Sequence, residues 1–247
     1  MTQWVLKGLR TGIRTTRYPL AREAAPGVTP GLPAPGLFAP HELDALVARC
    51  PTGALARTDR QLAVDARRCV HCFRCIRGPA PAAPWHSGYE WARGGSALGK
   101  AFARSIHIRV VDAGDCGACL REVKQLTGPY YNLHRLGFFI TPTPRQADVL
   151  LVVGAGTDQM REALVKCYAA MPTPRTVIAA GACALTGGIF GSSFICGGGI
   201  GAIIPVDVEV PGNPPPPLAI LHALLVATGR AAASGAPTNP DIHEAPK

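Results

Sequence analysis

The nine cysteines are the residues of this sequence whose type and spacing most directly suggest chemistry. The N-terminus lacks the charged start, apolar core and small-residue cleavage site of a secretory signal, so we expect a cytoplasmic protein whose thiols stay reduced. Metal or cluster ligation then explains the cysteines better than a disulfide framework. We define a first set, Cys50, Cys69, Cys72 and Cys75, and a second set, Cys116, Cys119 and Cys183. Cys167 and Cys196 belong to neither set.

The first set has the spacing of an iron–sulfur site. Three of its members form a C-x-x-C-x-x-C run, and Cys50, nineteen residues before Cys69, is followed directly by Pro51. Three thiolates on a tight loop hold three corners of a cubane, and in bacterial ferredoxins a Cys-Pro pair serves the cluster of a different motif. We therefore predict one [4Fe-4S] cluster on this set. A zinc site is the alternative.

The segment 41–77, which carries the first set, resembles a bacterial-type ferredoxin reduced to one cluster. His71 lies between two predicted ligands. We expect it to be an exposed loop residue, and a role in tuning the cluster potential is the alternative.

Composition and charge limit the classes of protein to consider. The chain has 247 residues, 17% of them charged, and no apolar run approaches the roughly 20 residues that cross a bilayer. Residues 1–110 carry a net charge of +10 and residues 111–247 a net charge of −1. The basic half suggests an acidic partner, an anionic membrane surface or nucleic acid. Because aromatic residues do not alternate with the basic ones, we do not expect nucleic-acid binding.

Proline and glycine divide the chain into segments. Trp4, Leu6, Leu9 and Ile13 alternate with basic residues, which predicts either a membrane-surface or partner-docking helix or a solvated terminus. The predicted organisation is a basic arm and Pro/Gly linker (1–40), a ferredoxin-like single-cluster domain (41–77), a linker (78–105), an α/β domain (106–230) and a disordered tail (231–247).

The last large segment alternates short apolar runs with helical patterns. Buried parallel strands are predicted at 106–111, 149–153, 176–180 and 203–210. Met160, Leu164, Cys167 and Met171 fall on one helical face, where Cys167 is expected to be a core residue, and a final helix spans 218–228. The pattern predicts a flavodoxin-like, doubly wound parallel sheet preceded by a small α+β ferredoxin-like domain. The second set follows the first and third strands, so its three thiolates should converge on one rim of the sheet.

Several motifs identify a family. The segments DCGACLREV, TPTPRQADVLLVVG, GACALTGG and IPVDVEVPGNPPPP together resemble the small subunit of [NiFe] hydrogenases and the homologous 20 kDa subunit of respiratory complex I, especially the membrane-bound energy-converting group. The similarity spans about residues 106–229. The N-terminal WVLKGLRTGIRTTRYP resembles the start of the ferredoxin-like subunits of complex I and formate hydrogenlyase.

The resemblance implies a second iron–sulfur cluster, [4Fe-4S] or three-iron, at Cys116, Cys119 and Cys183. Asn213 stands where the family has its fourth cysteine. Cys196, in a glycine-rich loop, is one candidate substitute. The alternatives are Asn213 or water as ligand, a three-iron cluster with that corner vacant, or a scaffold without this cluster.

The resemblance also assigns roles to two charged residues. Glu122 matches the hydrogenase-type C-x-x-C-x-x-E spacing, and in the family it faces the active site of the large subunit, where it would relay protons. A surface salt bridge is the alternative. Arg145 lies in a family motif near the partner interface and would pair with an acidic group there, or else it is an ordinary solvated arginine.

Together these features predict an iron–sulfur electron-transfer subunit of an oxidoreductase whose catalytic site lies in a partner. The implied partners are a homologue of the hydrogenase large subunit or of the complex I 49 kDa subunit, membrane subunits that translocate ions or protons, and a soluble electron donor or acceptor. The expected location is peripheral, on the cytoplasmic face of a membrane. The alternative is a structural subunit that has lost the second cluster and keeps only the ferredoxin-like one.

Overall fold

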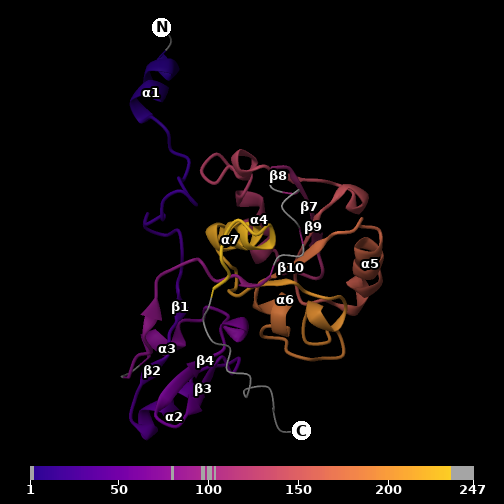
Figure 1. The fold of residues 1–247 in the computed structure, drawn as a ribbon. Coiled ribbons are helices and arrows are strands. Elements are labelled where there is room, and N and C mark those ends of the chain that lie inside the picture. The colour runs from indigo at the N-terminus through magenta and orange to yellow at the C-terminus, as the bar shows by residue number, and fades with distance from the viewer. Residues whose placement is uncertain (1–2, 79–80, 96–97, 99–101, 103, 235–247) are drawn as a thin grey trace.

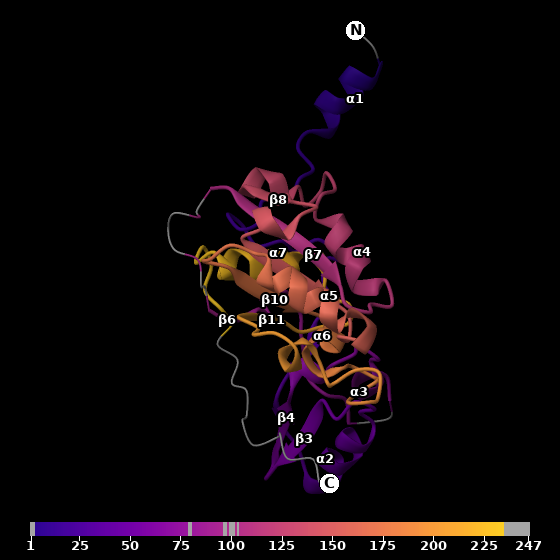
Figure 2. The same cartoon turned by 90° about the vertical axis from the view of Figure 1, so that its right-hand side faces the viewer.

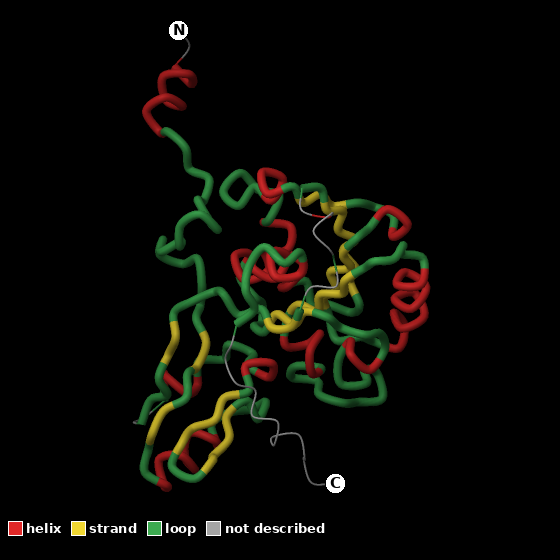
Figure 3. Tube along the Cα trace, in the orientation of Figure 1, coloured by secondary structure: helices red, strands yellow, loops and turns green. Residues whose placement is uncertain are grey.

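The computed structural model describes residues 3–78, 81–95, 98, 102 and 104–234. Figure 1 separates a larger α/β unit from a smaller unit that carries α2, α3, β3 and β4. Figure 3 shows that long loops connect the two units. In Figure 2, α1 (Gln3–Thr11) projects from the end of the molecule opposite the smaller unit.

The larger unit is built on a six-stranded sheet in the order β6-β11-β10-β9-β7-β8. Five strands are parallel neighbours and β6 joins the edge antiparallel to β11. The order of the five parallel strands, counted along the chain, is the 2-1-3-4-5 of flavodoxin-like folds, which confirms the predicted class. The strands are β6 (Arg93–Gly94), β7 (Ile106–Asp112), β8 (Phe138–Ile140), β9 (Val149–Val153), β10 (Thr176–Ala180) and β11 (Val208–Val210).

Helices cover both faces of this sheet. One face packs against α4 (Ala118–Gln125) and α7 (Pro217–Ala227), and the other against α5 (Asp158–Ala169) and α6 (Ala182–Thr186). Because both faces are covered, β9 and β10 are buried at every position, as continuous apolar strands require. Short 3-10 turns complete the unit: η3 (Leu133–Leu136), η4 (Pro144–Gln146) and η5 (Ile200–Ala202).

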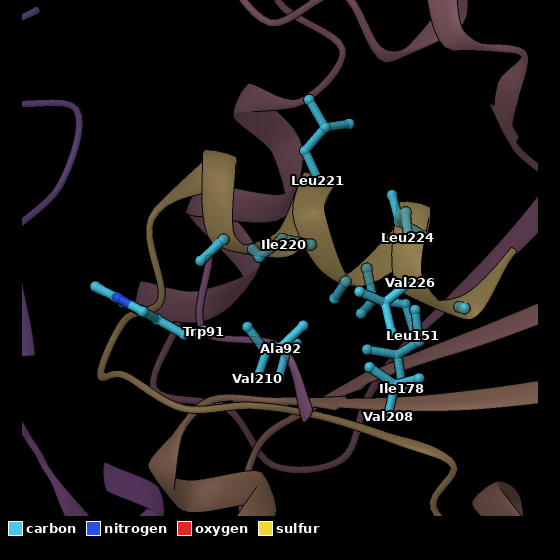
Figure 4. Packing of buried hydrophobic residues seen from close by; sticks show 14 of the residues in the cluster. Trp91, Ala92, Leu151, Ile178, Val208, Val210, Ile220, Leu221, Leu224 and Val226 are labelled. Atoms are coloured by element: carbon cyan, nitrogen blue, oxygen red, sulfur yellow. The ribbon is translucent and has the colours of Figure 1, made fainter. Parts of the chain in front are cut away.

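Helix α7 is buried along its whole length. Figure 4 shows Leu224 and Val226 of α7 beside Leu151 and Ile178 of the sheet. Its outer side is covered by extended chain, including Tyr89 and Trp91, so this largely apolar helix has no solvent face. The one polar side chain in its middle, His222, accepts a hydrogen bond from the Ala92 N–H at 3.3 Å through Nδ1, and its Nε2 lies 3.1 Å from the Ala232 carbonyl oxygen.

The smaller unit packs one helix on a three-stranded antiparallel sheet in the order β2-β4-β3. Its core contains Leu43 and Leu46 from α2, Leu55 from β3 and Leu62 from β4. The elements are β2 (Gly36–Leu37), α2 (Pro40–Ala48), β3 (Leu55–Thr58), β4 (Gln61–Val64), η1 (Ala66–Arg68) and α3 (Arg74–Arg77). A separate ribbon pairs β1 (Leu32–Pro33) with β5 (Trp85–His86).

Three of the four predicted strands are confirmed as β7, β9 and β10. The prediction of a strand over 203–210 was wrong for its first half, because only Val208–Val210 pair with β10 and the chain before them follows the η5 turn. The helical face predicted through Met171 ends earlier, since α5 stops at Ala169 and Met171 is buried just beyond it. Cys167 is half-buried against the α5 side of the core.

The stretches that the sequence assigns to linkers carry some regular structure. Strands β1 and β2 lie within the predicted arm and linker (1–40), and β5 and β6 lie within the predicted linker 78–105. The prediction of disorder over 231–247 falls mostly outside the described residues; Ser234, within them, donates its N–H to the Ala92 carbonyl oxygen at 2.7 Å.

Candidate metal centres

All four thiols of the first set line one pocket. Cys50 lies just beyond the end of α2, Cys69 follows η1, and Cys75 lies within α3. Cys72 lies in the loop between the last two elements, and the side chains of Phe73 and Trp85 complete the wall. The structure thus brings together four cysteines that the sequence separates by up to twenty-five positions.

Local backbone geometry supports the first set. The Ala54 N–H donates to Cys50 Sγ at 3.1 Å, and such a donor stabilises negative charge on sulfur. Thr52 Oγ1 donates to the Arg68 carbonyl oxygen at 2.7 Å and ties this turn to η1. His71 and Phe73 both have left-handed backbones, with φ of 52° and 60°. Such strain, about 1–3 kcal/mol per residue, persists only where the surroundings hold it and is common in ligand-binding loops.

Burial, with a smaller contribution from the neighbouring thiols, raises the pKa of the Cys69 thiol to about 12. The pKa of Cys75 is raised for the same two reasons. A thiol must lose its proton to become a metal ligand, so loading of this site releases protons and weakens as the pH falls.

The second set lies at the carboxyl edge of the parallel sheet. Cys116 and Cys119 follow β7 at the start of α4, and Cys183 follows β10 near the start of α6. Burial raises the pKa of Cys119 and of Cys183, and the nearby Cys116 thiol adds to the rise at both. The convergence on one rim that the strand order predicts is therefore present in the structure.

Glycine at position 181 makes this convergence possible. Gly181 joins β10 to α6 with φ of 103°, and a Cβ atom built on it would lie 2.7 Å from Cys119 Sγ. No side chain fits at that distance, so the close approach of the loop to the thiol requires glycine.

Cys196 lies beside Cys183. It is buried and packs with Cys183 and Ala155 in a small cluster of its own. Its Sγ is 3.3 Å from the Gly191 carbonyl oxygen and 3.4 Å from Ser193 Oγ. The Cys196 thiol therefore lies next to Cys183 with a carbonyl oxygen and a hydroxyl group within hydrogen-bonding distance.

Asn213 lies where the two units meet. It is half-buried after β11, and its backbone N–H donates to His71 Nδ1 at 3.3 Å. The expectation of an exposed His71 was wrong, because its left-handed backbone directs the ring toward Trp91, with ring centroids 5.9 Å apart. Burial lowers the pKa of His71 to about 4.

Asp115 is a residue of the second site that the sequence analysis missed. Its carboxylate accepts the N–H groups of Gly117 at 2.9 Å and Leu120 at 3.0 Å, which caps the start of α4. Burial is the main cause of the raised pKa of Cys119 and of Cys183, and the negative charge of the Asp115 carboxylate adds to the rise at both. An Asp directly before a helical C-x-x-C is a helix-start signal, and that signal could have found it.

Glu122 and Arg145 differ in their surroundings. Glu122 lies on α4, half-buried, and burial raises its pKa. Within the described ranges it forms no ion pair, so the salt-bridge alternative has no support there. Arg145 is exposed on η4.

The four thiols of the first set surround a pocket rather than meet at a point. Among the described residues, no three His, Cys, Asp or Glu side chains are arranged around a single metal ion. A cluster with several irons spreads its cysteines wider than one ion does. The four thiols around one pocket and the N–H donor to Cys50 Sγ fit such a group at the first site, and the neighbouring thiols of the second set, with Gly181 packed against Cys119 Sγ, fit one at the second.

Comparisons with known proteins identify the larger unit. A family model described as NADH ubiquinone oxidoreductase, 20 Kd subunit, matches residues 116–238. The probable membrane-bound hydrogenase subunit mbhJ of Pyrococcus furiosus is 41% identical over 130 residues, which is 53% of this chain and 78% of that protein. This chain belongs to the family of the NADH ubiquinone oxidoreductase 20 kDa subunit.

Two further relatives are longer or more distant. Formate hydrogenlyase subunit 7 of Escherichia coli is 38% identical over 134 residues, 54% of this chain, and the match spans about half of that protein, 52%. A chain of the membrane-bound sulfane sulfur reductase, an archaeal respiratory membrane complex, is 29% identical with a TM-score of 0.46 and covers 54% of this chain and 76% of its own.

The 20 kDa subunit family match includes the second set, Cys196 and Asn213, and it begins after the first set. The family consists of oxidoreductase subunits, and iron–sulfur binding is expected for its members. Both points agree with the family resemblance identified from the sequence motifs. Among the described residues no helix is both long and apolar enough to span a bilayer.

Proposed function

We propose that this chain is an electron-transfer subunit that carries two iron–sulfur clusters. The observation that carries the proposal is the presence of two separate sets of converging thiols on units packed against each other, with η1 of the first unit against α6 of the second. The first set would hold a [4Fe-4S] cluster and the second a [4Fe-4S] or three-iron cluster. A bound cluster supplies reversible one-electron transfer.

The chain's own residues would set the properties of each site. The Ala54 N–H stabilises charge on Cys50 Sγ, and the burial of Cys69 and Cys119 keeps water from the sulfurs. Glu122 is our proposed proton-relay group, since its raised pKa lets a carboxyl group both hold and release a proton nearer neutrality. It would act beside the second site, toward the catalytic site of a partner.

For the fourth corner of the second site we propose Cys196. Its support is the packing of the buried Cys196 against Cys183. The competing arrangements are Asn213 or water as ligand, a three-iron cluster, and the absence of this cluster.

The expected partners follow from what the relatives are called. One is a subunit of a membrane-bound hydrogenase and another a subunit of formate hydrogenlyase. We propose a large-subunit homologue of hydrogenase or of the complex I 49 kDa subunit beside the second site, where Phe190 and Phe194 are 59% and 90% exposed in the loop that leads to Cys196. Exposed apolar side chains gathered next to a site indicate a protein interface.

We further propose peripheral attachment to membrane subunits through α1. This helix buries none of its residues, and Trp4 and Leu9 are 74% and 73% exposed beside Lys7 and Arg10. An apolar side flanked by basic residues suits docking at a membrane surface or an acidic partner. Arg145, exposed on η4, is proposed to pair with an acidic group of the large subunit.

The test is the iron and acid-labile sulfide content of the full chain purified anaerobically, with EPR of the reduced sample. We expect about eight irons per chain in the parent and about four in Cys196→Ala. Cys167→Ala is the matched control, because Cys167 packs against the α5 side of the core away from both sets, and it should retain the parent's iron.

Each other outcome has a definite meaning. Two clusters that survive Cys196→Ala would assign the fourth corner to Asn213, water or a three-iron form. One cluster in the parent would favour a structural subunit that keeps only the ferredoxin-like relay. A parent with neither cluster would overturn the proposed function.

A further inference from the structure

We infer that His71 and the peptide group between Gly212 and Asn213 connect the two cysteine sets and form the route for electron transfer between them. The inference rests on the proposed function, because it needs both sites to carry clusters. The route runs, in order, through Cys72, His71, Asn213, Gly212, Ala182 and Cys183.

Every step of this route is a covalent bond or a hydrogen bond. His71 precedes Cys72 of the first set, and its Nδ1 accepts the Asn213 N–H at 3.3 Å. The carbonyl of that same peptide group, on Gly212, accepts the Ala182 N–H at 2.8 Å. Ala182 immediately precedes a cysteine of the second set, so one peptide group is hydrogen-bonded to both cysteine loops.

The surroundings hold this peptide group in place. Gly212 has φ of 119°, and a Cβ atom on it would lie 2.9 Å from Pro215 Cα and 3.2 Å from the Trp91 ring. Trp91 also packs against the His71 ring. Glycine therefore allows the turn to approach both the ring and the proline, and the packed ring fixes the position of Nδ1.

An ion pair also joins the two units near this route. Arg67 of η1 lies 3.0 Å from Glu209 of β11, and both side chains are mostly buried, at 23% and 28% exposed. The positive charge of Arg93 interacts electrostatically with the carboxylates of Asp65 and Glu209. These charges flank the route and keep the two loops in register across the interface.

The step along this route transfers one electron and makes or breaks no bond. His71 Nδ1 acts as a hydrogen-bond acceptor throughout, so the step requires no proton from this side chain. We assign His71 a role in the electronic coupling between the two loops and not in catalysis, because its hydrogen bond connects them and it contacts neither a substrate nor a reacting atom in the structure.

The test compares two substitutions of similar size. In His71→Asn the side-chain oxygen can accept the Asn213 N–H, and asparagine tolerates a left-handed backbone. In His71→Leu the acceptor is removed. Full chains loaded with iron and sulfide receive one electron equivalent by flash photoreduction, and rapid-freeze EPR follows its equilibration between the two clusters. We expect H71L to be about tenfold slower than the parent, as for other supporting partners of metal ligands, and H71N to stay close to the parent.

Two further measurements separate this role from a purely structural one. The magnetic interaction between the two reduced clusters reports their separation, and we expect it to be the same in the parent, H71L and H71N. If H71L does not fold, His71→Gly replaces it, because glycine adopts the left-handed backbone without strain and also lacks the acceptor.

Equilibration in H71L as fast as in the parent, or in H71N as slow as in H71L, would overturn the assignment of His71. A changed magnetic interaction in H71L would also overturn it, since the side chain would then merely hold the units together. Iron content keeps this test apart from the proposed function: a parent chain that loads one cluster contradicts the two-cluster relay itself, whereas two loaded clusters with unaltered rates in H71L contradict the His71 route alone.

Discussion

At the scale of single residues, the second site depends on positions that carry no chemistry of their own. Gly181 leaves room for Cys119 Sγ, and Asp115 caps the helix that presents Cys116 and Cys119. The thiols converge because their backbone supports are short and rigid, which is the general requirement for a preorganised metal site.

Gly181→Ala tests this dependence. A Cβ atom 2.7 Å from Cys119 Sγ, on a backbone with φ of 103°, must push the thiol or the loop aside. We expect a loss of about 1–3 kcal/mol in the free energy of unfolding and loss of iron from the second site alone. Iron per chain and thermal unfolding measure both effects.

Gly201→Ala is the control for that substitution, since a Cβ atom on the exposed Gly201 would meet nothing within 4 Å. It should leave stability and iron content at the parent level. A G181A protein with full iron and parent stability would mean that the site adapts to the added methyl group, contrary to the tight fit described above.

At the scale of elements, α7 fills the core on one face of the large sheet. It is buried throughout and apolar apart from His222. The two ring nitrogens of His222 contact the Ala92 N–H and the Ala232 carbonyl oxygen, in the segments that cover the helix. A helix with no solvent face cannot be stable alone, so its helicity depends on this tertiary cover.

The imidazole of His222 makes that cover dependent on pH. Burial lowers the pKa of His222 below its ordinary value of 6.5, so the unfolded chain binds this proton more readily than the folded chain. Stability from His222 is therefore complete above that value and decreases as the pH falls below it. We expect His222→Asn, which retains an acceptor for the Ala92 N–H but does not titrate, to reduce the loss of stability between about pH 7.5 and pH 5.5.

Urea unfolding at the two pH values measures this effect, with His41→Asn as the control because His41 is exposed on α2. The control should keep the parent's full pH dependence. His71, whose pKa is also lowered, contributes in the same direction, so some dependence should persist in H222N. An H222N protein with the parent's slope would show that this imidazole does not titrate on unfolding.

At the scale of the whole molecule, two units with different folds share one charged interface. Arg67 of the smaller unit pairs with Glu209 of the larger one, and Arg93 and Asp65 lie close by. The chain segments of the linkers pack over α7 as well, so the two units are joined along a surface and not merely tethered.

Glu209→Gln should weaken this interface. Its removal leaves Arg67 and Arg93 without their shared anion in a mostly buried position, which we expect to lower the free energy of unfolding by about 2–4 kcal/mol. Asp44→Asn is the matched control, because the Asp44–Arg57 pair is exposed, and its loss should cost about 1 kcal/mol or less. The denaturant midpoints of the two variants measure these losses of stability. Equal losses in both would mean that the interface pair contributes no more to stability than a surface pair.

The sequence by itself determined the family, the sheet and the two cysteine groups. Continuous apolar runs such as 149–153 predict buried parallel strands because both faces must be covered, and a strand order that places Cys116 and Cys183 after strands brings them to one edge. Such inferences succeed because they depend on local pattern and on the few ways a parallel sheet can be connected.

Only the tertiary structure decided how the two units meet. His71 and Asn213 are 142 positions apart in the sequence. Nothing in their local sequence predicts that the left-handed backbone of His71 brings its ring to the N–H of Asn213. The same holds for the short strand β11, which begins only at Val208, whereas the apolar pattern of 203–210 predicted an earlier start. Contacts between distant segments depend on the final packing of both, so a periodic pattern within either segment carries no information about them.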